Sequence, residues 1–445
     1  RIAIDPFGED KGRMTQTPRE VIEQTPMGLR QWIAVILMIA LNALDGFDVL
    51  SSAFAAPGIA KEWGIQRDAL GVVLSMELVG MGFGSILLGG AADRFGRRPT
   101  ILVCLLVMTS GMWLATTSGS PSGLALWRFI TGLGIGGMLA AINAVTAELS
   151  SLKGRSLAMA LMVIGYPIGA TIGGTVAGEL LKEGDWRVVF EFGAIATAVF
   201  IPLVFLFVPE TPDYYVTRRA PDALDRINVS LRKLAMPLAS VLPPVPDHVE
   251  KPGVFDIFKP GLLRTTVLFT LGYSFHAITF YYILKWSPKI VADFGYTQPQ
   301  AASVLVWANI GGAIGGGLFG YAMHRFGLKW PTIVMLLTGS VAVMAFGFGR
   351  ETLDGWKVAV FCTGFTTNAA IVGFYALFAK GFPTHVRATG TGFAIGAGRI
   401  GAAGSPILAG VLFTQAGLGL LGVSIVMAMG SLLAAAMLLM LRKEV

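Results

Sequence analysis

Long apolar stretches dominate this sequence and constrain its fold more than any other feature. A helix needs about 20 mostly apolar residues to cross the hydrocarbon core of a bilayer, and polar turns separate twelve stretches of this kind. Only 14% of the residues are charged, against about 25% in soluble proteins. We therefore predict an all-α polytopic membrane protein with helices near residues 31–56, 68–91, 98–118, 123–147, 156–181, 187–208, 264–287, 298–322, 331–349, 356–381, 388–414 and 418–441.

The lysines and arginines predict how these helices are oriented. If the N-terminus is cytoplasmic, most of the basic loop residues fall on the cytoplasmic side, which is the usual bias of membrane proteins. The outer loops then carry fewer, among them Lys285 and Lys289. This bias explains the net charge of +7 without a nucleic acid as partner. The polar segment 1–30 is expected to be cytoplasmic and not a signal peptide, so both termini are predicted inside.

The two halves of the chain repeat each other. The sequence DRFG at 93–96 recurs as HRFG at 324–327, an offset of 231 residues. The segment between the halves is charged and proline-rich, so we interpret it as a cytoplasmic linker, with a short helix near 221–235. Two six-helix halves are typical of secondary transporters, whose substrate site lies near the midplane between them. The predicted parts are an N-terminal segment 1–30, a first half 31–208, a linker 209–263, a second half 264–441 and a tail 442–445.

Two aspartates lie inside the first predicted helix, in the stretch ALNALDGFDVLSSAF. Asp45 and Asp48 are three residues apart, so they share one face of the helix. That face should point into the bundle, because lipid does not tolerate charged groups. Desolvation and a neighbouring carboxylate both disfavour the charged form of an acid, so we predict a proton-coupling pair. The alternative is that one aspartate only pairs with an arginine to hold helices together.

Arg128 and Glu77 are further charged residues within predicted helices. At 1.5 Å per residue, Arg128 lies at about the height of Asp48, so we expect it to be the partner of the aspartates. A static ion pair is the alternative. Glu77 lies in the middle of the second predicted helix and is a second candidate proton site. Its alternative role is a permanently protonated acid bound to a neighbouring helix.

Several motifs connect the chain to a known family. GGAADRFGRRP (89–99), LWRFITGLGIGG (126–137) and VPETPDYY (208–215) resemble motifs of the major facilitator superfamily. Within it, DGFD in the first helix and VRATGTGFAIGAGRIGAAGSP (386–406) resemble the aromatic acid:proton symporter family of 4-hydroxybenzoate and protocatechuate permeases. The resemblance implies the major facilitator fold and uptake of a benzoate-like acid. His324 departs from it, because the corresponding loop often carries an acid there.

Arg399 is the predicted ligand of a substrate carboxylate. It lies near the midplane, no acid on its own helix neutralises it, and arginine binds a carboxylate through a bidentate fork. The resemblance places a substrate arginine at this position and a coupling arginine at Arg128. The alternative is that Arg399 neutralises Asp45 or Glu77 across the bundle.

His276 corresponds to Asp45 in the repeat, so we predict that it faces the same cavity. Histidine titrates near neutral pH and can donate a hydrogen bond to a carboxylate or a phenol. A hydrogen bond between helices is the alternative.

Aromatic residues crowd the helix near 264–287. Tyr273, Phe280 and Tyr281 are predicted to form flat walls for an aromatic ring, although Tyr281 suits an interfacial belt equally well. Trp286 lies nearer the outer end, where we expect it to belong to an interfacial belt. Asn309 and Asn368 lie midway along their helices and are candidates to hydrogen-bond the substrate, although contacts between helices suit them equally well.

The resemblance also implies a cytoplasmic gate in the loop 89–99. The matching residues of the superfamily hold the two halves together when the substrate site faces outward. Glu148 and Arg155 flank the next cytoplasmic loop and are expected to join the same network. The predicted gate residues are Asp93, Arg94, Gly96, Arg97, Arg98, Glu148 and Arg155.

The residues and the resemblance together predict a proton-coupled importer (a symporter) of a small aromatic carboxylic acid. We expect it to work as a monomer by alternating access in a bacterial inner membrane, with no cofactor or metal besides the coupling protons. A proton-driven exporter of organic acids or drugs is the alternative on the same fold. An intramembrane enzyme or receptor is the alternative of a different class, and the lack of HExxH and GxSxG motifs counts against an enzyme.

Overall fold

The computed structural model describes residues 16–244, 254–383 and 386–441. In this part of the chain, twelve helices are long and apolar enough to cross a membrane, which confirms the predicted all-α fold. The predicted tail 442–445 and residues 1–15 lie outside the described residues, as does the side chain of His324. The long helices are α2 (Leu29–Trp63), α3 (Arg67–Leu87), α5 (Arg97–Thr116), α6 (Pro121–Leu149), α7 (Arg155–Leu180), α8 (Arg187–Phe207), α11 (Pro260–Asp293), α12 (Gln298–Phe326), α13 (Lys329–Phe346), α14 (Leu353–Gly381), α15 (Arg387–Thr414) and α16 (Leu420–Leu439).

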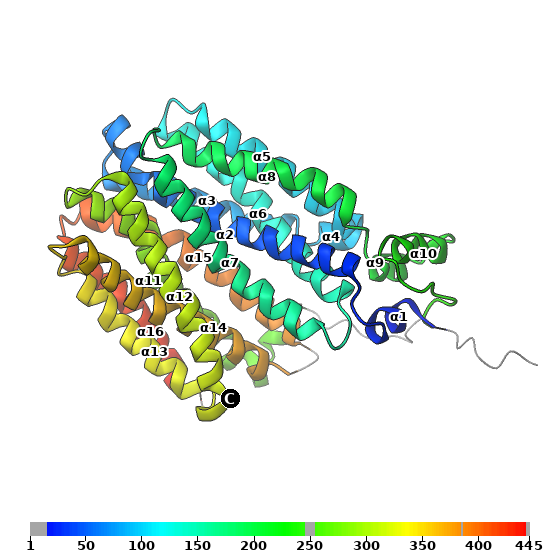
Figure 1. The fold of residues 1–445 in the computed structure, drawn as a ribbon. Helices are drawn as coiled ribbons and strands as arrows, with labels where there is room; N and C mark the ends of the chain where they lie inside the picture. The colour runs from blue at the N-terminus through cyan, green and yellow to red at the C-terminus, as the bar shows by residue number, and fades with distance from the viewer. Residues whose placement is uncertain (1–15, 245–253, 384–385, 442–445) are drawn as a thin grey trace, which may run out of the picture.

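Short helices flank the long ones. Three of them, α1, α9 and α10, lie together at one end of the bundle (Figure 1), which we call the linker end. We call the opposite end of the bundle the far end. The short helix predicted near 221–235 corresponds to α10. The short helices are α1 (Pro18–Gln24), α4 (Ala91–Phe95), α9 (Pro212–Arg218), α10 (Ala223–Lys233) and the 3₁₀ helix η1 (Val254–Phe258).

The internal repeat extends over all twelve long helices. A shift of 231 residues places α2 on α11 to within one residue, and it places α5, α6, α7 and α8 on α13, α14, α15 and α16 to within three residues. The same shift places the start of α3 on the start of α12, and α12 continues for eight residues past the shifted end of α3. Pro57 in α2 and Pro288 in α11 are related by the same shift. Gly96 and Gly327, which end the DRFG and HRFG motifs, have φ angles of 109° and 77°, a region that favours glycine. The two halves are therefore copies of one six-helix plan.

The two halves meet chiefly where α3 packs on α15, α7 on α12 and α2 on α11. The hydrogen bonds and ion pairs that join the described long helices of the two halves lie at the far end or in the middle. At the far end, Arg67 Nη2 lies 2.8 Å from Asp293 Oδ2, and the backbone N–H of Asp68 donates to Thr414 Oγ1 at 3.2 Å. Towards the linker end the halves diverge (Figure 1). The halves are thus closed at the far end and spread apart at the linker end.

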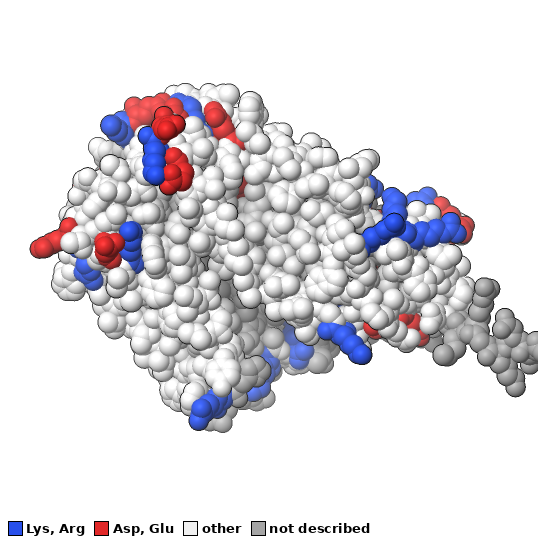
Figure 2. All heavy atoms as spheres, in the orientation of Figure 1, with Lys and Arg blue, Asp and Glu red and all other residues white. Residues whose placement is uncertain are grey.

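Charged side chains gather at the two ends of the bundle and leave a broad uncharged belt between them (Figure 2). Large apolar side chains are exposed on the long helices, for example Ile172, Val199 and Val341. An uncharged, apolar belt suits the hydrocarbon core of a bilayer. The charged side chains buried inside the bundle are the exception, and such residues mark functional sites in membrane proteins.

Candidate functional site

A cluster of fully buried charges lies where α3, α6 and α11 approach each other. Glu77 of α3 is at its centre, with Oε1 2.6 Å from Arg128 Nη2 and Oε2 3.3 Å from Lys285 Nζ. All three side chains have no exposed surface. Ser52 of α2 adds a hydroxyl donor to Glu77 Oε2 at 3.4 Å. One carboxylate therefore joins a cation of its own half to a cation of the other half.

Glycines bring the helices of this cluster together. A Cβ at Gly132 of α6 would overlap the carbonyl oxygen of Glu77, and a Cβ at Gly80 of α3 would overlap the carbonyl oxygen of Phe129. Small residues at such contacts let helix backbones approach closely in a membrane. Arg128 lies one turn before Gly132, so the close approach places its guanidinium on Glu77. The spaced glycines of LWRFITGLGIGG thus position the ion pair.

The partner of Arg128 differs from the prediction. Its ion pair is with Glu77, and towards Asp48 it donates to the backbone carbonyl, with Nη2 2.9 Å from the oxygen. The predicted height was correct, but the carboxylate of Asp48 points towards α8, where a Cβ on Gly193 would lie 3.2 Å from Oδ1. The guanidinium also lies 5.1 Å from the centre of the Phe190 ring.

Asp45 and Asp48 are both buried, at 2% and 0% exposure. Among the described residues, none of their four carboxylate oxygens has a hydrogen-bond partner. An ionised carboxylate loses its hydration on burial, and no donor here replaces it. The charge of Asp45 interacts with that of Arg399 on α15, across the boundary between the halves. The aspartates are therefore buried acids whose nearest opposite charges are not bonded to them.

Lys285 was missed by the sequence analysis, which assigned it to an outer loop. It lies within α11, is fully buried, and donates from Nζ to Glu77 and to the backbone carbonyl of Val49 in α2. The error arose because Lys285 lies two residues before the predicted helix end at 287 and was counted with the outer loop, whereas α11 continues to Asp293. The repeat held a signal for it, since Lys285 corresponds to Phe54, which is itself fully buried in α2.

Arg399 is half-buried, and its guanidinium has no hydrogen bond or ion pair with any described residue. Its charge acts on Asp45 and on the phenols of Tyr273 and Tyr281 in α11, so these groups share one neighbourhood. The close packing of α15 on α11 has a local cause, because a Cβ at Gly398 would overlap the ring of Tyr273. Arg399 is thus a cation near aromatic rings with no bonded partner among the described residues, and its role as the ligand of a substrate carboxylate stays a prediction.

The aromatic candidates line the same region. Tyr273 Oη lies 3.1 Å from Tyr375 Oη, and Tyr375, which the sequence analysis did not select, is 41% exposed. Phe280 and Tyr281 are half-buried, and their rings meet edge to face at 5.2 Å between centres. Trp286 does not belong to an interfacial belt as expected: it is fully buried, and its indole N–H donates to the Pro406 carbonyl at 3.3 Å.

His276 supports the alternative that the sequence left open. It is fully buried, and its two ring nitrogens lie 2.9 Å from the Thr367 carbonyl oxygen and 2.8 Å from Ser431 Oγ. Since a carbonyl oxygen only accepts, Nε2 carries the hydrogen of that bond. Both polar atoms of the ring are therefore used between α11, α14 and α16, which corrects the prediction that His276 faces the cavity.

The two asparagines also make contacts with helix backbones. The amide nitrogen of Asn309 donates to the Leu305 carbonyl of its own helix at 2.9 Å. That of Asn368 donates from α14 to the Gly312 carbonyl of α12 at 2.7 Å. Asn368 is half-buried, whereas Asn309 is 6% exposed. Asn368 thus joins two helices, and each amide keeps its oxygen and its second N–H for a ligand.

The predicted gate residues form a network inside the first half. Arg97 Nη2 lies 3.0 Å from both Asp93 Oδ1 and Glu148 Oε1. Glu210, which follows α8, accepts the backbone N–H groups of Arg97 at 3.0 Å and Arg98 at 3.2 Å, so its carboxylate caps the start of α5. Burial raises the pKa of Glu210, while these hydrogen bonds lower it.

Gly96 is required beside this cap, because a Cβ there would overlap Glu210 Oε2 and its φ is 109°. The backbone carbonyl of Arg94 accepts hydrogen bonds from Arg218 and Tyr214 near α9. Arg155 departs from the expected network. Its Nη2 pairs with Glu23 Oε1 of α1 at 3.0 Å instead of with Glu148.

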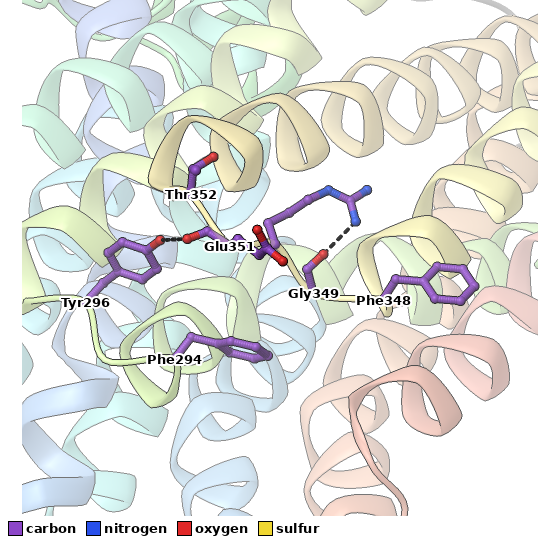
Figure 3. A pocket seen from close by; sticks show the side chains of 7 residues that line it. Phe294, Tyr296, Phe348, Gly349, Glu351 and Thr352 are labelled. Carbon is purple, nitrogen blue, oxygen red and sulfur yellow. Dashed lines mark hydrogen bonds between the residues drawn. The ribbon is translucent and has the colours of Figure 1, made fainter.

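Two surface pockets lie at the far end, away from the buried charges. One has a volume of about 750 Å³, and Figure 3 shows it between the loops that follow α11 and α13. There the hydroxyl of Tyr296 donates to the Glu351 carbonyl at 2.9 Å. The other, of about 930 Å³, lies between the halves and includes Lys61 and Lys289. Neither pocket contains a predicted substrate or proton residue.

Two six-helix repeats with buried charges where they meet are the architecture of a secondary transporter. The chain belongs to the Major Facilitator Superfamily, whose family model matches residues 35–289. It is therefore a membrane transporter and not an enzyme.

Proteins that resemble this chain in sequence or in structure are also transporters. The chain is 27% identical to a gallate transporter of Pseudomonas putida over 90% of each chain, and 28% identical to a benzoate transport protein of Acinetobacter baylyi over 89% of this chain and 86% of that one. It is 28% identical to the 3-(3-hydroxy-phenyl)propionate transporter of Escherichia coli over 93% and 94%. Among solved structures, the partially occluded inward-open xylose transporter XylE of E. coli superimposes with a TM-score of 0.72 at 16% identity, over 94% of this chain and 99% of that one.

Proposed function

We propose that this protein is a proton-coupled importer of a small aromatic carboxylate. It would act as a monomer in a bacterial inner membrane, with the linker end in the cytoplasm and protons as its coupling ion. The named relatives carry gallate, benzoate and a phenylpropionate, which supports an aromatic acid as the cargo. The basic bias of the loops at the linker end supports the orientation.

The observation that carries the proposal is the guanidinium of Arg399, which bonds to no described residue and lies near Tyr273 and Tyr281. A carboxylate satisfies a guanidinium through two parallel N–H···O bonds. The neighbouring phenol rings offer faces and edges against which an aromatic ring packs favourably. An aromatic acid thus matches both parts of this site, the cation and the rings.

The charges of the cluster suggest how protons are coupled to the substrate. In the middle of the bundle, three acids are matched in number by three basic residues. The acids are Asp45, Asp48 and Glu77, and the basic residues are Arg128, Lys285 and Arg399. A substrate carboxylate adds one negative charge, and an unbalanced charge is costly in this setting. Asp45 lies in the electrostatic field of Arg399, and its carboxylate accepts no hydrogen bond from any residue that the structure describes. When the substrate carboxylate binds the guanidinium of Arg399, Asp45 loses its counter-charge and binds a proton.

Rocking of the two halves would then expose the loaded site to either end in turn. With the linker end in the cytoplasm, a bundle closed at the far end and spread apart at the linker end would be in the state that releases cargo into the cytoplasm. Restoring the outward-facing state requires that the far-end contacts open.

Uptake by purified protein in proteoliposomes tests the proposal. Benzoate, 4-hydroxybenzoate, gallate and aliphatic acids are compared with and without an inward proton gradient, for wild type, Asp45→Asn and the surface control Asp354→Asn. We expect gradient-stimulated uptake of an aromatic acid by wild type and the control, and loss of the stimulation in Asp45→Asn. Equal uptake with and without the gradient would refute proton coupling, and uptake confined to aliphatic acids would refute the substrate class.

A further inference from the structure

Lys285 belongs to the second half, yet both of its polar partners belong to the first. Its ammonium lies 3.3 Å from Glu77 Oε2 in α3 and donates to the carbonyl of Val49 in α2. It is fully buried, and the repeat places an apolar residue, Phe54, at the equivalent position of the first half. The lysine is therefore a cross-link between the halves and not part of the shared packing plan.

This contact lies deeper than the other polar contacts between the halves. Arg67 and Asp293 also pair across the boundary, but their side chains are 39% and 28% exposed near the surface of the far end. Exposed pairs contribute little to stability because water screens them. Lys285 and Glu77 are shielded from water completely, so their separation leaves a buried ammonium without its counter-charge.

Opening the far end has to break this contact, because α11 cannot move away from α2 and α3 while Lys285 holds both. When the contact with Lys285 breaks, the carboxylate of Glu77 keeps one counter-charge, because Arg128 of its own half stays 2.6 Å from its other oxygen. That Glu77 keeps Arg128 as a partner also guides the choice of variants. Removing Lys285 leaves Glu77 paired with Arg128, so a lysine variant creates no unpaired buried carboxylate.

We propose that Lys285 and Glu77 form a latch between the halves, and that this latch holds the far end closed. The latch is a positioning device of the transport cycle: it sets the balance between the two orientations without contacting the substrate. It follows from the two-half architecture and does not depend on which acid is carried or on proton coupling.

Distances between spin labels across the far end test the latch directly. Labels are attached to cysteines at Glu183, in the α7–α8 loop, and Asp354, in the first turn of α14, after Cys104 and Cys362 are replaced by serine. The variants are Lys285→Met, Lys285→Arg and, from the other side of the latch, Glu77→Gln. Lys289→Met is the matched control, because Lys289 lies one turn further along α11 and pairs with Asp293 of the same helix.

We expect wild type, Lys285→Arg and Lys289→Met to give mainly one short distance in detergent without substrate. Lys285→Met and Glu77→Gln should each add a population at longer distance, and combining them should produce no further shift, as for two changes to one contact. An unchanged distribution in folded Lys285→Met or folded Glu77→Gln would overturn the proposal. A longer distance in Lys289→Met would overturn it too. Because no substrate is present, failure of the substrate proposal in the uptake assay leaves this result intact.

Discussion

Arg128 of α6 and Glu77 of α3 form a fully buried ion pair, with 2.6 Å between Nη2 and Oε1. Breaking a buried pair by removing one partner typically costs about 3–5 kcal/mol, because the other charge is left without compensation. The pair depends on a backbone contact one turn away, where Gly132 faces the carbonyl of Glu77. The side chains of the ion pair and the close approach of α3 and α6 that aligns them can therefore be tested by separate substitutions.

Gly132→Ala should separate α3 from α6. The added methyl group overlaps the carbonyl oxygen of Glu77, and overpacking of this kind costs about 1–3 kcal/mol. We expect a lower midpoint of thermal unfolding in detergent and reduced uptake. Gly82→Ala on α3 is the control, because a Cβ there has no neighbour within 4 Å. Equal midpoints for the two variants would contradict the close contact.

Arg128→Lys should abolish most transport although it keeps the charge. The guanidinium contacts Glu77, the Asp48 carbonyl and the face of Phe190 at once, and a lysine offers one compact ammonium for all three. We expect uptake to fall at least tenfold while the protein remains folded by size-exclusion chromatography. Arg187→Lys, which alters a partly exposed pair with Glu62, should stay within about twofold of wild type. Near-normal uptake by Arg128→Lys would show that charge alone suffices.

Arg399→Lys should weaken substrate binding. A bidentate, charge-assisted contact is worth about 1.5–3 kcal/mol, so we expect Kd to rise about tenfold to a hundredfold. Isothermal titration of purified protein with the transported acid measures this change. Arg387→Lys, in the first turn of the same helix, is the control. An unchanged Kd in Arg399→Lys would remove the proposed carboxylate ligand.

His276→Ala should reduce stability and leave substrate affinity unchanged. The change removes the hydrogen bonds to Thr367 and Ser431, and a buried polar group left unpaired costs about 1–3 kcal/mol. Thermal unfolding and the Kd for substrate are measured on the same preparation. A large loss of affinity with normal stability would restore the role that the repeat suggested for His276.

The attachment of α1 should loosen in acid. Hydrogen bonds from Arg19 and Arg155 lower the pKa of Glu23 below its ordinary value. Because the folded pKa is lowered, the contact stabilises the attached state above the unfolded pKa of about 4.3 and is lost as pH falls through the lower folded value. A spin label at Gln24→Cys should become more mobile in that range, and Glu23→Gln should make it mobile at neutral pH. Glu179→Gln, at the far end, should have no effect.

Length and hydropathy alone determined much of this fold. Each apolar stretch is long enough to cross a bilayer, and a chain in lipid has to satisfy its backbone hydrogen bonds within each helix. The twelve helices therefore follow from local sequence, although α2 and α11 extend seven and six residues beyond their predicted ends at 56 and 287. The repeat follows too, since an offset of 231 residues relates even Pro57 to Pro288. Burial of Asp45, Asp48, Glu77 and Arg128 was also predictable, because charged groups inside membrane helices avoid lipid.

The sequence did not determine which buried charge meets which. Helical spacing placed Arg128 level with Asp48, but the glycine contact between α3 and α6 turned its guanidinium to Glu77. Lys285 was assigned to a loop, but in the structure it links the two halves. His276 corresponds to Asp45 in the repeat, but both of its ring nitrogens make hydrogen bonds to neighbouring helices. Each of these outcomes depends on how far two helices approach and how each is rotated about its axis. Residues far apart in the chain set both quantities through packing, so only the tertiary structure decided them.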